Sequence, residues 1–420
     1  MIERFSIDAL ADALDERLAV SDAELLQRYP GDPGTRQPVH TVYVPADRYA
    51  ARLVLDWGQR ALALVAEHLP TADRVAESIG LSPELAAEVL PLVLAKLADE
   101  PVEDLRIDFE DGFGDRGDAA EDAAVDAAVA ALAESIAAGT VPPFVGIRFK
   151  SLEKPTRRRG LHTLDRFVGG LVAAGGLPEG FVVTLPKVTA VEQVQAMVTV
   201  CEHLESAYAL ADRRLTFEIQ VETPQSILLP DGTAAIARMI AAAHGRCSGL
   251  AYGTYDYSAA CGISAGYQSM EHPAADHAKA VMQVAAAGTG VRLSDGSTNV
   301  LPVGSTEAMH AAWRLHARLV DRSLQRGFYQ GWDLHPAQLP TRYLATFAFY
   351  RNGFDTAAQR LRAYATLDAS GFLDEPATAR ALAWFISRGV QCGAITASEV
   401  LERTNLELPA LDALAHNRKG

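Results

Sequence analysis

The sequence has few cysteines, no long uncharged apolar run and no excess of basic residues. Its four cysteines, Cys201, Cys247, Cys261 and Cys392, stand far apart and show no CxxC or CxxH spacing. This pattern predicts neither a zinc site nor a disulfide framework, so we expect reduced thiols that mostly pack in the interior. No run reaches the roughly 18 apolar residues that span a bilayer, and the acidic N-terminus lacks a signal-peptide core. We therefore expect a cytoplasmic protein with no membrane partner.

Acidic residues outnumber basic ones. The chain has 38 lysines and arginines against 53 aspartates and glutamates, which gives a formal net charge of −15. Nucleic acid and anionic membrane surfaces would repel such a chain over roughly 8 Å at physiological salt. We expect no nucleic-acid partner and a small molecule as the ligand. An apolar content of 49% with 22% charged residues is typical of a globular protein.

Short β-rich runs alternate with longer helical stretches from residue 41 onward. The runs are TVYVP (41–45), LRIDFE (105–110), VGIRFK (145–150), FVVTLPKV (181–188), LTFEIQVE (215–222), GLAYGTYD (249–256), the weaker VRLSDGSTNVLPV (291–303) and GWDLH (331–335). Eight strands separated by helices predict an α/β fold, a (β/α)8 TIM barrel.

Three parts of the chain are expected around this barrel. Residues 1–38 form an N-terminal extension, a short helix followed by a Pro/Gly-rich linker, and residues 39–340 form the catalytic barrel. Residues 341–420 form a C-terminal helical region that serves as a cap or an oligomer arm. Between the first two strands, about residues 50–104, we expect a helical insertion in which Ser82 caps a helix that starts at Pro83.

Polar and apolar residues alternate within the strands. In LTFEIQVE the odd-numbered residues are apolar and the even-numbered ones are polar, and LRIDFE and GIRFK split in the same way. An antiparallel sheet with one wet face would also alternate, but the helix after nearly every strand disfavours it. In a barrel the polar face lines the lumen, and barrel enzymes keep their chemistry at the C-terminal strand ends.

Glu222 and Asp256 are the strongest pair of candidate ligands. Each ends a predicted strand, the two strands are consecutive, and adjacent strands lie about 4.8 Å apart. Both carboxylates could therefore reach one hard cation such as Mg²⁺ or Mn²⁺. Alternatively, each could pair with an arginine. The strand position alone favours neither hypothesis.

Two cationic side chains face the same end of the predicted barrel. Arg148 ends the third strand, where its guanidinium could bind an oxyanion or enolate, or could neutralise Asp108 or Glu110. Lys187 could form a Schiff base, but nothing nearby in the sequence desolvates it, so an ion pair is favoured.

Seven ordered segments resemble a known family. They are VYVPADRY (42–49), DFEDG (108–112), IRF (147–149), TLPKV (184–188), IQVETPQSI (219–227), YGTYDYSAACG (252–262) and WDLHPAQ (332–338). In this order they resemble the signature segments of the HpcH/HpaI aldolase and citrate lyase β-subunit family, one of the pyruvate/phosphoenolpyruvate-binding barrels. GTYDYSAACG and RGLH (159–162) also resemble malate synthase, a related Mg²⁺ barrel.

The resemblance implies roles for particular residues. Glu222 and Asp256 match the metal ligands, and Arg148 matches the arginine beside the reacting carbonyl oxygen. Glu110 and Asp111 match an acidic pair that orients metal-bound waters and the arginine. The turn that contains Gly253, Thr254 and Tyr255 lies where the family holds the carboxylate of a 2-oxo acid, and Lys187 of the TLPKV segment is assigned to the same substrate site.

The resemblance further implies a Mg²⁺-dependent carbon–carbon lyase, an aldolase or an acyl-CoA lyase, that acts through the enolate of a small 2-oxo acid or hydroxy-oxo acid. A malate-synthase-like acyl-CoA condensation and a non-catalytic barrel that binds a small carboxylate are the alternatives. Arg157, Arg158 and Arg159 could clamp a CoA thioester or form a solvated basic loop, and the loop is favoured. We expect a homo-oligomer, a trimer or a hexamer.

The general base is not assigned. Some acyl-CoA lyases of the family take an aspartate from a neighbouring subunit, and the C-terminal region here offers Asp355, Asp368 and Asp374 with no matching motif. His335 lies at a strand end and is expected to be structural.

Overall fold

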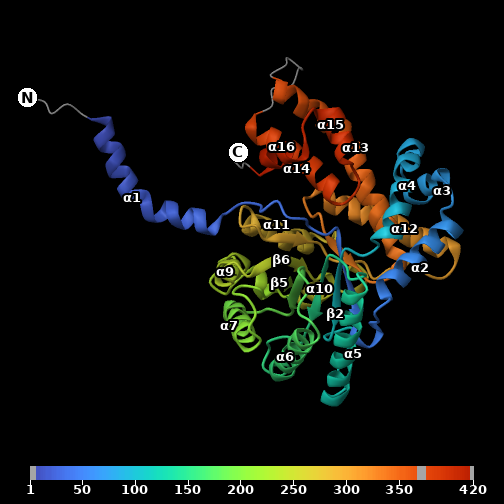
Figure 1. Ribbon diagram of the computed structural model, residues 1–420, viewed down its shortest axis with the longest axis horizontal. Coiled ribbons are helices and arrows are strands. Elements are labelled where there is room, and N and C mark those ends of the chain that lie inside the picture. Colours follow the sequence, from blue (N-terminus) through green and yellow to red (C-terminus); the bar gives the residue numbers. More distant parts are fainter. Residues whose placement is uncertain (1–5, 367–374, 417–420) are drawn as a thin grey trace, which may run out of the picture.

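Eight parallel strands form the centre of the molecule (Figure 1). The structure is a computed structural model that describes residues 6–366 and 375–416. The strands are β1 His40–Pro45, β2 Asp104–Asp108, β3 Phe144–Arg148, β4 Phe181–Leu185, β5 Thr216–Val221, β6 Cys247–Tyr252, β7 Arg292–Ser294 and β8 Gly331–Asp333. Their order is β7-β6-β5-β4-β3-β2-β1-β8, and a parallel bridge between Ser294 and Gln330 brings the two outer strands together. The predicted barrel is confirmed, with a strand in each of the eight predicted runs.

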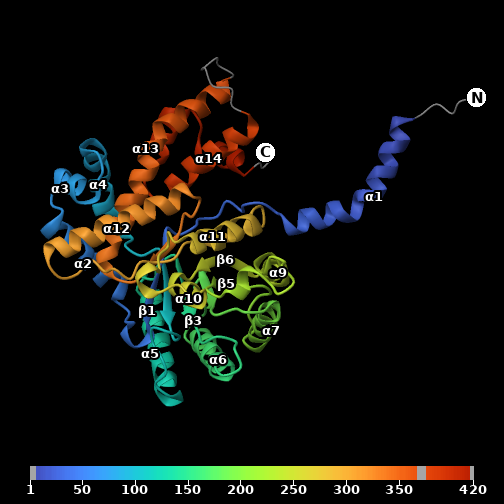
Figure 2. The same ribbon diagram turned by 180° about the vertical axis from the view of Figure 1, so that it is seen from behind.

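Helices follow most strands and cover the outside of the barrel (Figures 1 and 2). They are α5 Asp118–Ala137, α6 Arg157–Ala173, α7 Val191–Ala207, α8 Pro224–Ile227, α9 Ala235–Ala242, α10 Thr254–Ala260, α11 Pro273–Ala286 and α12 Thr306–Gln325, with the 3-10 turns η1 Ala46–Arg48, η2 Ala265–Tyr267 and η3 Pro336–Gln338. Because strand side chains alternate in direction, Ile107, Ile147 and Ile219 pack outward in the apolar core and are fully buried.

The polar strand face lines the lumen, as the alternation predicts. Arg106 donates through Nε to Glu218 Oε1 and to Thr184 Oγ1, both at 3.1 Å, and the Tyr43 hydroxyl donates to Glu218 at 3.2 Å. All four side chains are buried. A buried ion costs several kcal/mol or more unless it is paired, so this network lets charged side chains fill the barrel interior.

A second buried network holds β1 and β8 together. Asp333 contacts His40 Nδ1 at 2.8 Å, His316 Nε2 at 3.1 Å and the Arg342 guanidinium at 2.9 Å. Burial would raise the pKa of Asp333, but Arg342 and the two histidines outweigh it and hold that pKa well below its usual range. Burial lowers the pKa of His316 and, together with Arg342 and His40, outweighs Asp333, which acts in the opposite direction.

This network makes stability depend on pH. Below about pH 6.5 the unfolded chain takes up a proton on His316 that the folded chain resists, so the contribution of His316 to stability is expected to fall as the pH drops from 7 to 5. In His316→Gln, which has no such proton, the fall should be smaller by about 1 kcal/mol. Urea unfolding of both proteins at each pH measures the difference. Identical pH dependence in the two proteins would show that His316 does not contribute to the pH dependence of stability.

Helices of the insertion and of the C-terminal region pack together beside the barrel (Figure 1). The insertion forms α2 Leu53–His68, α3 Ala72–Ile79 and α4 Pro83–Asp99, and the end of the chain forms α13 Leu339–Thr366, α14 Pro376–Gln391, α15 Ala397–Thr404 and α16 Leu408–Ala415. The predicted cap is confirmed, since Ser82 Oγ accepts from the Leu85 N–H. Helix α13 packs against both α4 and α12, which joins the two regions.

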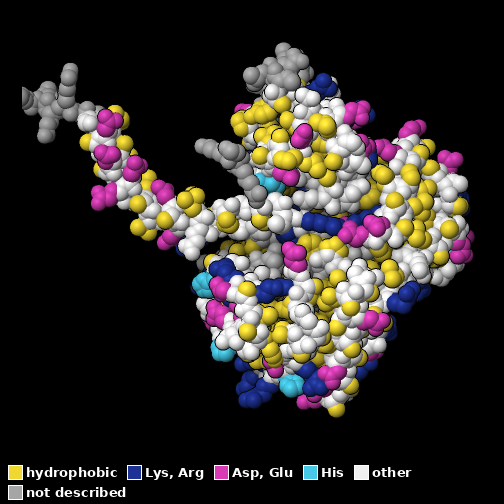
Figure 3. All heavy atoms as spheres, in the orientation of Figure 1, with side chains coloured by type: hydrophobic (Ala, Val, Ile, Leu, Met, Phe, Trp, Pro, Cys, Tyr) yellow, Lys and Arg dark blue, Asp and Glu magenta, His cyan; other side chains and the backbone are white. Residues whose placement is uncertain are grey.

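The first helix projects away from the rest of the chain (Figures 1 and 2). Helix α1 Ile7–Arg28 is 22 residues long and has no buried residue. It carries both hydrophobic and acidic side chains on its surface (Figure 3). The linker after it is anchored, since Arg36 contacts Glu103 at 2.8 Å and Asp32 contacts Arg388 at 3.3 Å.

Among the described residues, no single helix is long and apolar enough to cross a membrane. Helices α3 and α4 reach that length and apolarity only when taken together, and they meet at a bend of 109°.

Candidate functional site

Charged side chains gather at the C-terminal ends of the strands. Asp108 and Arg148 are the last residues of β2 and β3, and Glu222 directly follows β5. Glu110 and Asp111 lie in the loop after β2, and Lys187 lies two residues after β4.

The strand prediction for Asp256 was wrong: β6 ends at Tyr252, and Asp256 lies in the first turn of α10. The chain turns into a helix immediately after Gly253, so Asp256 reaches the site from a helix.

Asp108 fixes the position of Arg148. Its carboxylate accepts from Arg148 Nε at 2.8 Å and from Nη2 at 2.6 Å, and it also accepts from the N–H groups of Glu110 and Gly112. The guanidinium also lies 5.0 Å from the centre of the Tyr43 ring. Such bidentate pairing sets the plane of the guanidinium. The remaining nitrogen, Nη1, has longer contacts: 3.4 Å to Glu110 and 3.4 Å to Gln220.

Lys187 joins the acidic residues. Its Nζ lies 2.8 Å from Glu110 Oε1, 2.8 Å from Asp111 Oδ2 and 3.0 Å from Asp256 Oδ2. Its own N–H donates to Glu222 Oε1 at 2.7 Å. Burial would lower the pKa of Lys187, but Glu222 and the other carboxylates outweigh it and raise that pKa. The ion-pair role favoured from the sequence is therefore present, with three carboxylates as partners.

The carboxylates differ in their surroundings. Glu222 is 2% exposed, and burial raises its pKa to about 8 although Lys187 and Arg148 act in the opposite direction. Burial also raises the pKa of Glu110. Asp111 is 55% exposed at its side chain, and Lys187 outweighs its partial burial and lowers its pKa. The cluster thus runs from a desolvated floor at Glu222 to an exposed mouth.

Glu222 is held on two sides. Its Oε2 accepts from Gln220 Nε2 at 2.6 Å. A Cβ atom at Gly253 would lie 2.5 Å from the Cβ of Glu222, which is closer than two non-bonded carbon atoms can approach. Gly253 is therefore the residue that lets β6 pass beside Glu222.

The start of α10 lies next to this floor. Thr254 is buried, and its Oγ1 has no hydrogen-bond partner among the described residues. The Tyr255 hydroxyl accepts from the Asn299 N–H at 2.6 Å. The Gly253 N–H donates to the Val221 carbonyl at 2.9 Å, which ties the start of the helix to β5.

Glu222 and Asp256 fit a hard divalent cation. Each Glu222 oxygen accepts one hydrogen bond, so lone pairs remain, and Asp256 supplies a half-exposed carboxylate. Mg²⁺ commonly takes one or two protein carboxylates and fills its other positions with water and substrate oxygens. Within residues 6–366 and 375–416 no group of three or more His, Cys, Asp or Glu side chains forms a metal cage. The donor set therefore suits an ion that is shared with a substrate.

The remaining candidates lie apart from the cluster or have other partners. His335 caps η3 through the Ala337 N–H, and burial lowers its pKa. Arg159 contacts Asp122 at 2.6 Å, and Arg158 is exposed. Asp355 is exposed, while residues 368 and 374 lie outside the described part of the chain. Asp108, named from the sequence as one of two possible partners of Arg148, is its main partner. Gln220 and Tyr43 received no role from the sequence, and their lumen-facing strand positions were the available signal.

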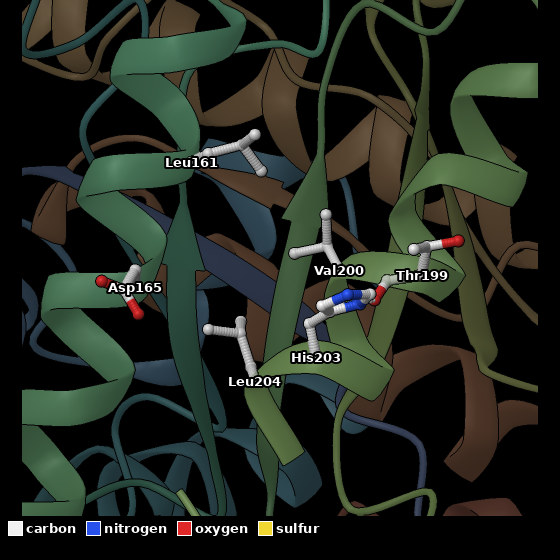
Figure 4. A pocket seen from close by; sticks show the side chains of 6 residues that line it. All are labelled: Leu161, Asp165, Thr199, Val200, His203 and Leu204. Carbon is white, nitrogen blue, oxygen red and sulfur yellow. Dashed lines mark hydrogen bonds between the residues drawn. The ribbon is translucent and has the colours of Figure 1, made fainter. Parts of the chain in front are cut away.

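A hollow of about 330 Å³ lies between α6 and α7, on the outside of the barrel (Figure 4). Leu161, Asp165, Thr199, Val200, His203 and Leu204 line it. Its polar groups are already bonded, since Asp165 accepts from the Tyr208 hydroxyl and His203 contacts the Thr199 carbonyl. It lacks the converging unpaired groups of a ligand site, so the strand-end cluster is the better candidate.

Fold and cluster together define a (β/α)8 barrel with a charged site at the C-terminal ends of its strands, where such barrels build their active sites. Residues 18–419 match the family described as "Domain of unknown function (DUF6986)", and the chain belongs to this family. No curated protein sequence matches the chain.

Several solved structures are similar to this chain. A citrate lyase from Burkholderia xenovorans LB400 is 18% identical, with a TM-score of 0.54 over 91% of this chain and 97% of that one. A malate synthase from Haloferax volcanii in complex with magnesium and glyoxylate is 14% identical, with a TM-score of 0.47 over 91% and 98%. The citrate lyase β subunit from M. tuberculosis with oxaloacetate and magnesium is 18% identical, with a TM-score of 0.43 over 74% and 98%. These families are the ones that the sequence motifs resemble, and the likeness to the first structure shows a shared fold.

Proposed function

We propose that this chain is a carbon–carbon lyase that acts on a small 2-oxo acid or hydroxy-oxo acid, with Glu222 and Asp256 as ligands of Mg²⁺ or Mn²⁺. One observation carries the proposal: Glu110, Asp111 and Asp256 converge on the Lys187 ammonium at the C-terminal end of the barrel, and Glu222 accepts from the N–H of the same residue, beside the fixed Arg148 guanidinium. The seven ordered motifs that resemble the aldolase and citrate lyase β-subunit family support the same function.

Arg148 is suited to stabilise negative charge on the 2-oxygen of the substrate. Nε and Nη2 are held by Asp108, which leaves Nη1 with only its two 3.4 Å contacts. A donor that is fixed before the reaction stabilises a developing enolate without reorganising. A divalent ion on Glu222 and Asp256 would add positive charge at the carboxylate and the 2-oxygen of the substrate.

Two other elements would hold the substrate. The buried, unpartnered Thr254 hydroxyl can donate to a carboxylate, and Gly253 and Tyr255 shape the turn around it. Lys187 carries a raised pKa, so its ammonium stays protonated at neutral pH and serves as a positive charge and not as a base.

Thermal unfolding with Mg²⁺ and a 2-oxo acid tests the proposal. Wild-type protein is expected to gain several °C with Mg²⁺ plus pyruvate or oxaloacetate, because a ligand that binds only the folded state stabilises it. Glu222→Ala and Asp256→Ala should lose this gain. Release of pyruvate from 4-hydroxy-2-oxo acids, measured with a coupled dehydrogenase, tests cleavage directly.

The controls separate the alternatives. A wild-type protein that is indifferent to Mg²⁺ with every 2-oxo acid tried would contradict the proposal. A gain with glyoxylate that requires acetyl-CoA would instead favour the malate-synthase-like condensation. A gain without turnover of any substrate tried would favour a barrel that only binds a small carboxylate.

A further inference from the structure

The Lys187 ammonium is surrounded by carboxylates. Three carboxylates from two separate segments, the loop after β2 and the first turn of α10, place an oxygen within 3.0 Å of Nζ. The side chain is 26% exposed, so the ammonium lies at the mouth of the cluster, whereas Glu222 lies buried at its floor. The ammonium is therefore the counter-ion of three carboxylates at the mouth of the cluster.

The backbone of Lys187 is also fixed beside the cluster. Its φ of 51° lies in the left-handed region, which residues other than glycine seldom adopt. Its N–H donates to Glu222 Oε1 at 2.7 Å. Main chain and side chain of one residue therefore contact all four carboxylates of the cluster, Glu222 through the N–H and the other three through the ammonium.

The charge count leaves the cluster short of positive charge. Asp108 already takes up two nitrogens of Arg148, and the third has only 3.4 Å contacts. One ammonium then faces the three carboxylates of Glu110, Asp111 and Asp256. A divalent ion would neutralise these carboxylates better than a single ammonium, but Asp256 Oδ2 cannot serve both cations at once without bringing them within a few Å of each other.

We propose that Lys187 is a built-in counter-cation: its ammonium holds the carboxylates together in the metal-free protein and competes with the divalent ion for Asp256. This inference rests on the proposed function, since it takes Glu222 and Asp256 as the ion's ligands. Lys187 thereby weakens binding of the ion alone and keeps the site folded whenever no ion is bound.

Mn²⁺ binding to the full chain tests the inference, measured by isothermal titration calorimetry without substrate. Lys187→Met should bind Mn²⁺ about tenfold or more tightly than wild type, because a unit charge within a few Å opposes a divalent ion even when solvent screens it. In EDTA the same variant should unfold at a lower temperature than wild type, and Mn²⁺ should raise its midpoint by more. Lys187→Arg, which keeps the charge, and Lys154→Met, at an exposed lysine, should behave like wild type.

Each other outcome has a distinct meaning. Equal or weaker Mn²⁺ binding by Lys187→Met, with clear binding by wild type, overturns this inference and leaves the proposed metal site intact. Binding by neither protein overturns this inference, whereas the proposed function fails only if the protein is also indifferent to Mg²⁺ together with every 2-oxo acid tried. Loss of binding in Asp256→Asn shows that the titrated site is the proposed one. If Lys187→Met does not fold in EDTA, Lys187→Gln supplies the same comparison, since it also removes the charge.

Discussion

Replacing Glu222 by glutamine is expected to abolish the proposed lyase activity, with turnover lowered by about 10³-fold or more. The amide keeps the size of the side chain but supplies one neutral oxygen in place of a charged carboxylate, so a hard divalent ion loses a ligand. Steady-state turnover at saturating Mg²⁺ measures the loss. Glu192→Gln, at an exposed glutamate of α7, is the matched control and should retain wild-type turnover. Turnover within a few-fold of wild type in Glu222→Gln would show that Glu222 is not a ligand.

The same substitution should not unfold the protein. Burial raises the pKa of Glu222 from 4.5 to about 8, so the folded state holds this proton more tightly than the unfolded state, and stability is lost as the pH rises from 4.5 toward 8. Glutamine has no proton to lose. Glu222→Gln in EDTA at pH 8 is therefore expected to be as stable as wild type or more stable by about 1–2 kcal/mol. Urea unfolding measures this. A large loss would mean that the hydrogen bond from Gln220 matters more than the desolvated charge.

Replacing Asp108 by alanine is expected to lower the free energy of unfolding by about 3–5 kcal/mol. The substitution leaves the buried Arg148 guanidinium without its main partner, and it also leaves the N–H groups of Glu110 and Gly112 without an acceptor. Removing one partner of a buried pair leaves an uncompensated charge, which costs more than the pair itself contributes. Urea unfolding at pH 7 gives the difference.

Asp115→Ala is the control for this prediction. Asp115 lies in the same loop but is exposed, and among the described residues its carboxylate accepts only from the Gly117 N–H, at 3.2 Å. Its removal should cost less than about 1 kcal/mol. Equal losses in the two variants would mean that the loop, and not the pair with Arg148, accounts for the effect.

Much of the fold could be predicted from short stretches of sequence. The period-two alternation in residues 215–222 assigns each side chain to the lumen or to the helices, because successive strand residues point in opposite directions. Ser82 before Pro83 marks a helix start because the serine hydroxyl accepts from a free N–H group of the first turn. Each of these signals is contained in a few consecutive residues, so no distant contact is needed to find it.

The strand prediction failed where the chain leaves β6. GLAYGTYD was predicted as strand to its end, but the last three of these residues begin α10. Gly253 lies against Glu222, and its N–H bonds to the Val221 carbonyl. The change from strand to helix depends on these contacts with β5, which lies about 30 residues earlier, and a local pattern of apolar residues does not contain them.

The sequence by itself determined the eight strands, the side chains that face the lumen, and the residue types available for chemistry. The tertiary structure alone decided how these side chains pair. It set Arg148 on Asp108, placed Asp256 on a helix, and brought the Lys187 ammonium among carboxylates that lie 76 and 69 residues away in the chain. Alternation along a strand fixes the direction of a side chain but not its partner, because partners at the barrel mouth come from loops whose paths depend on long-range packing.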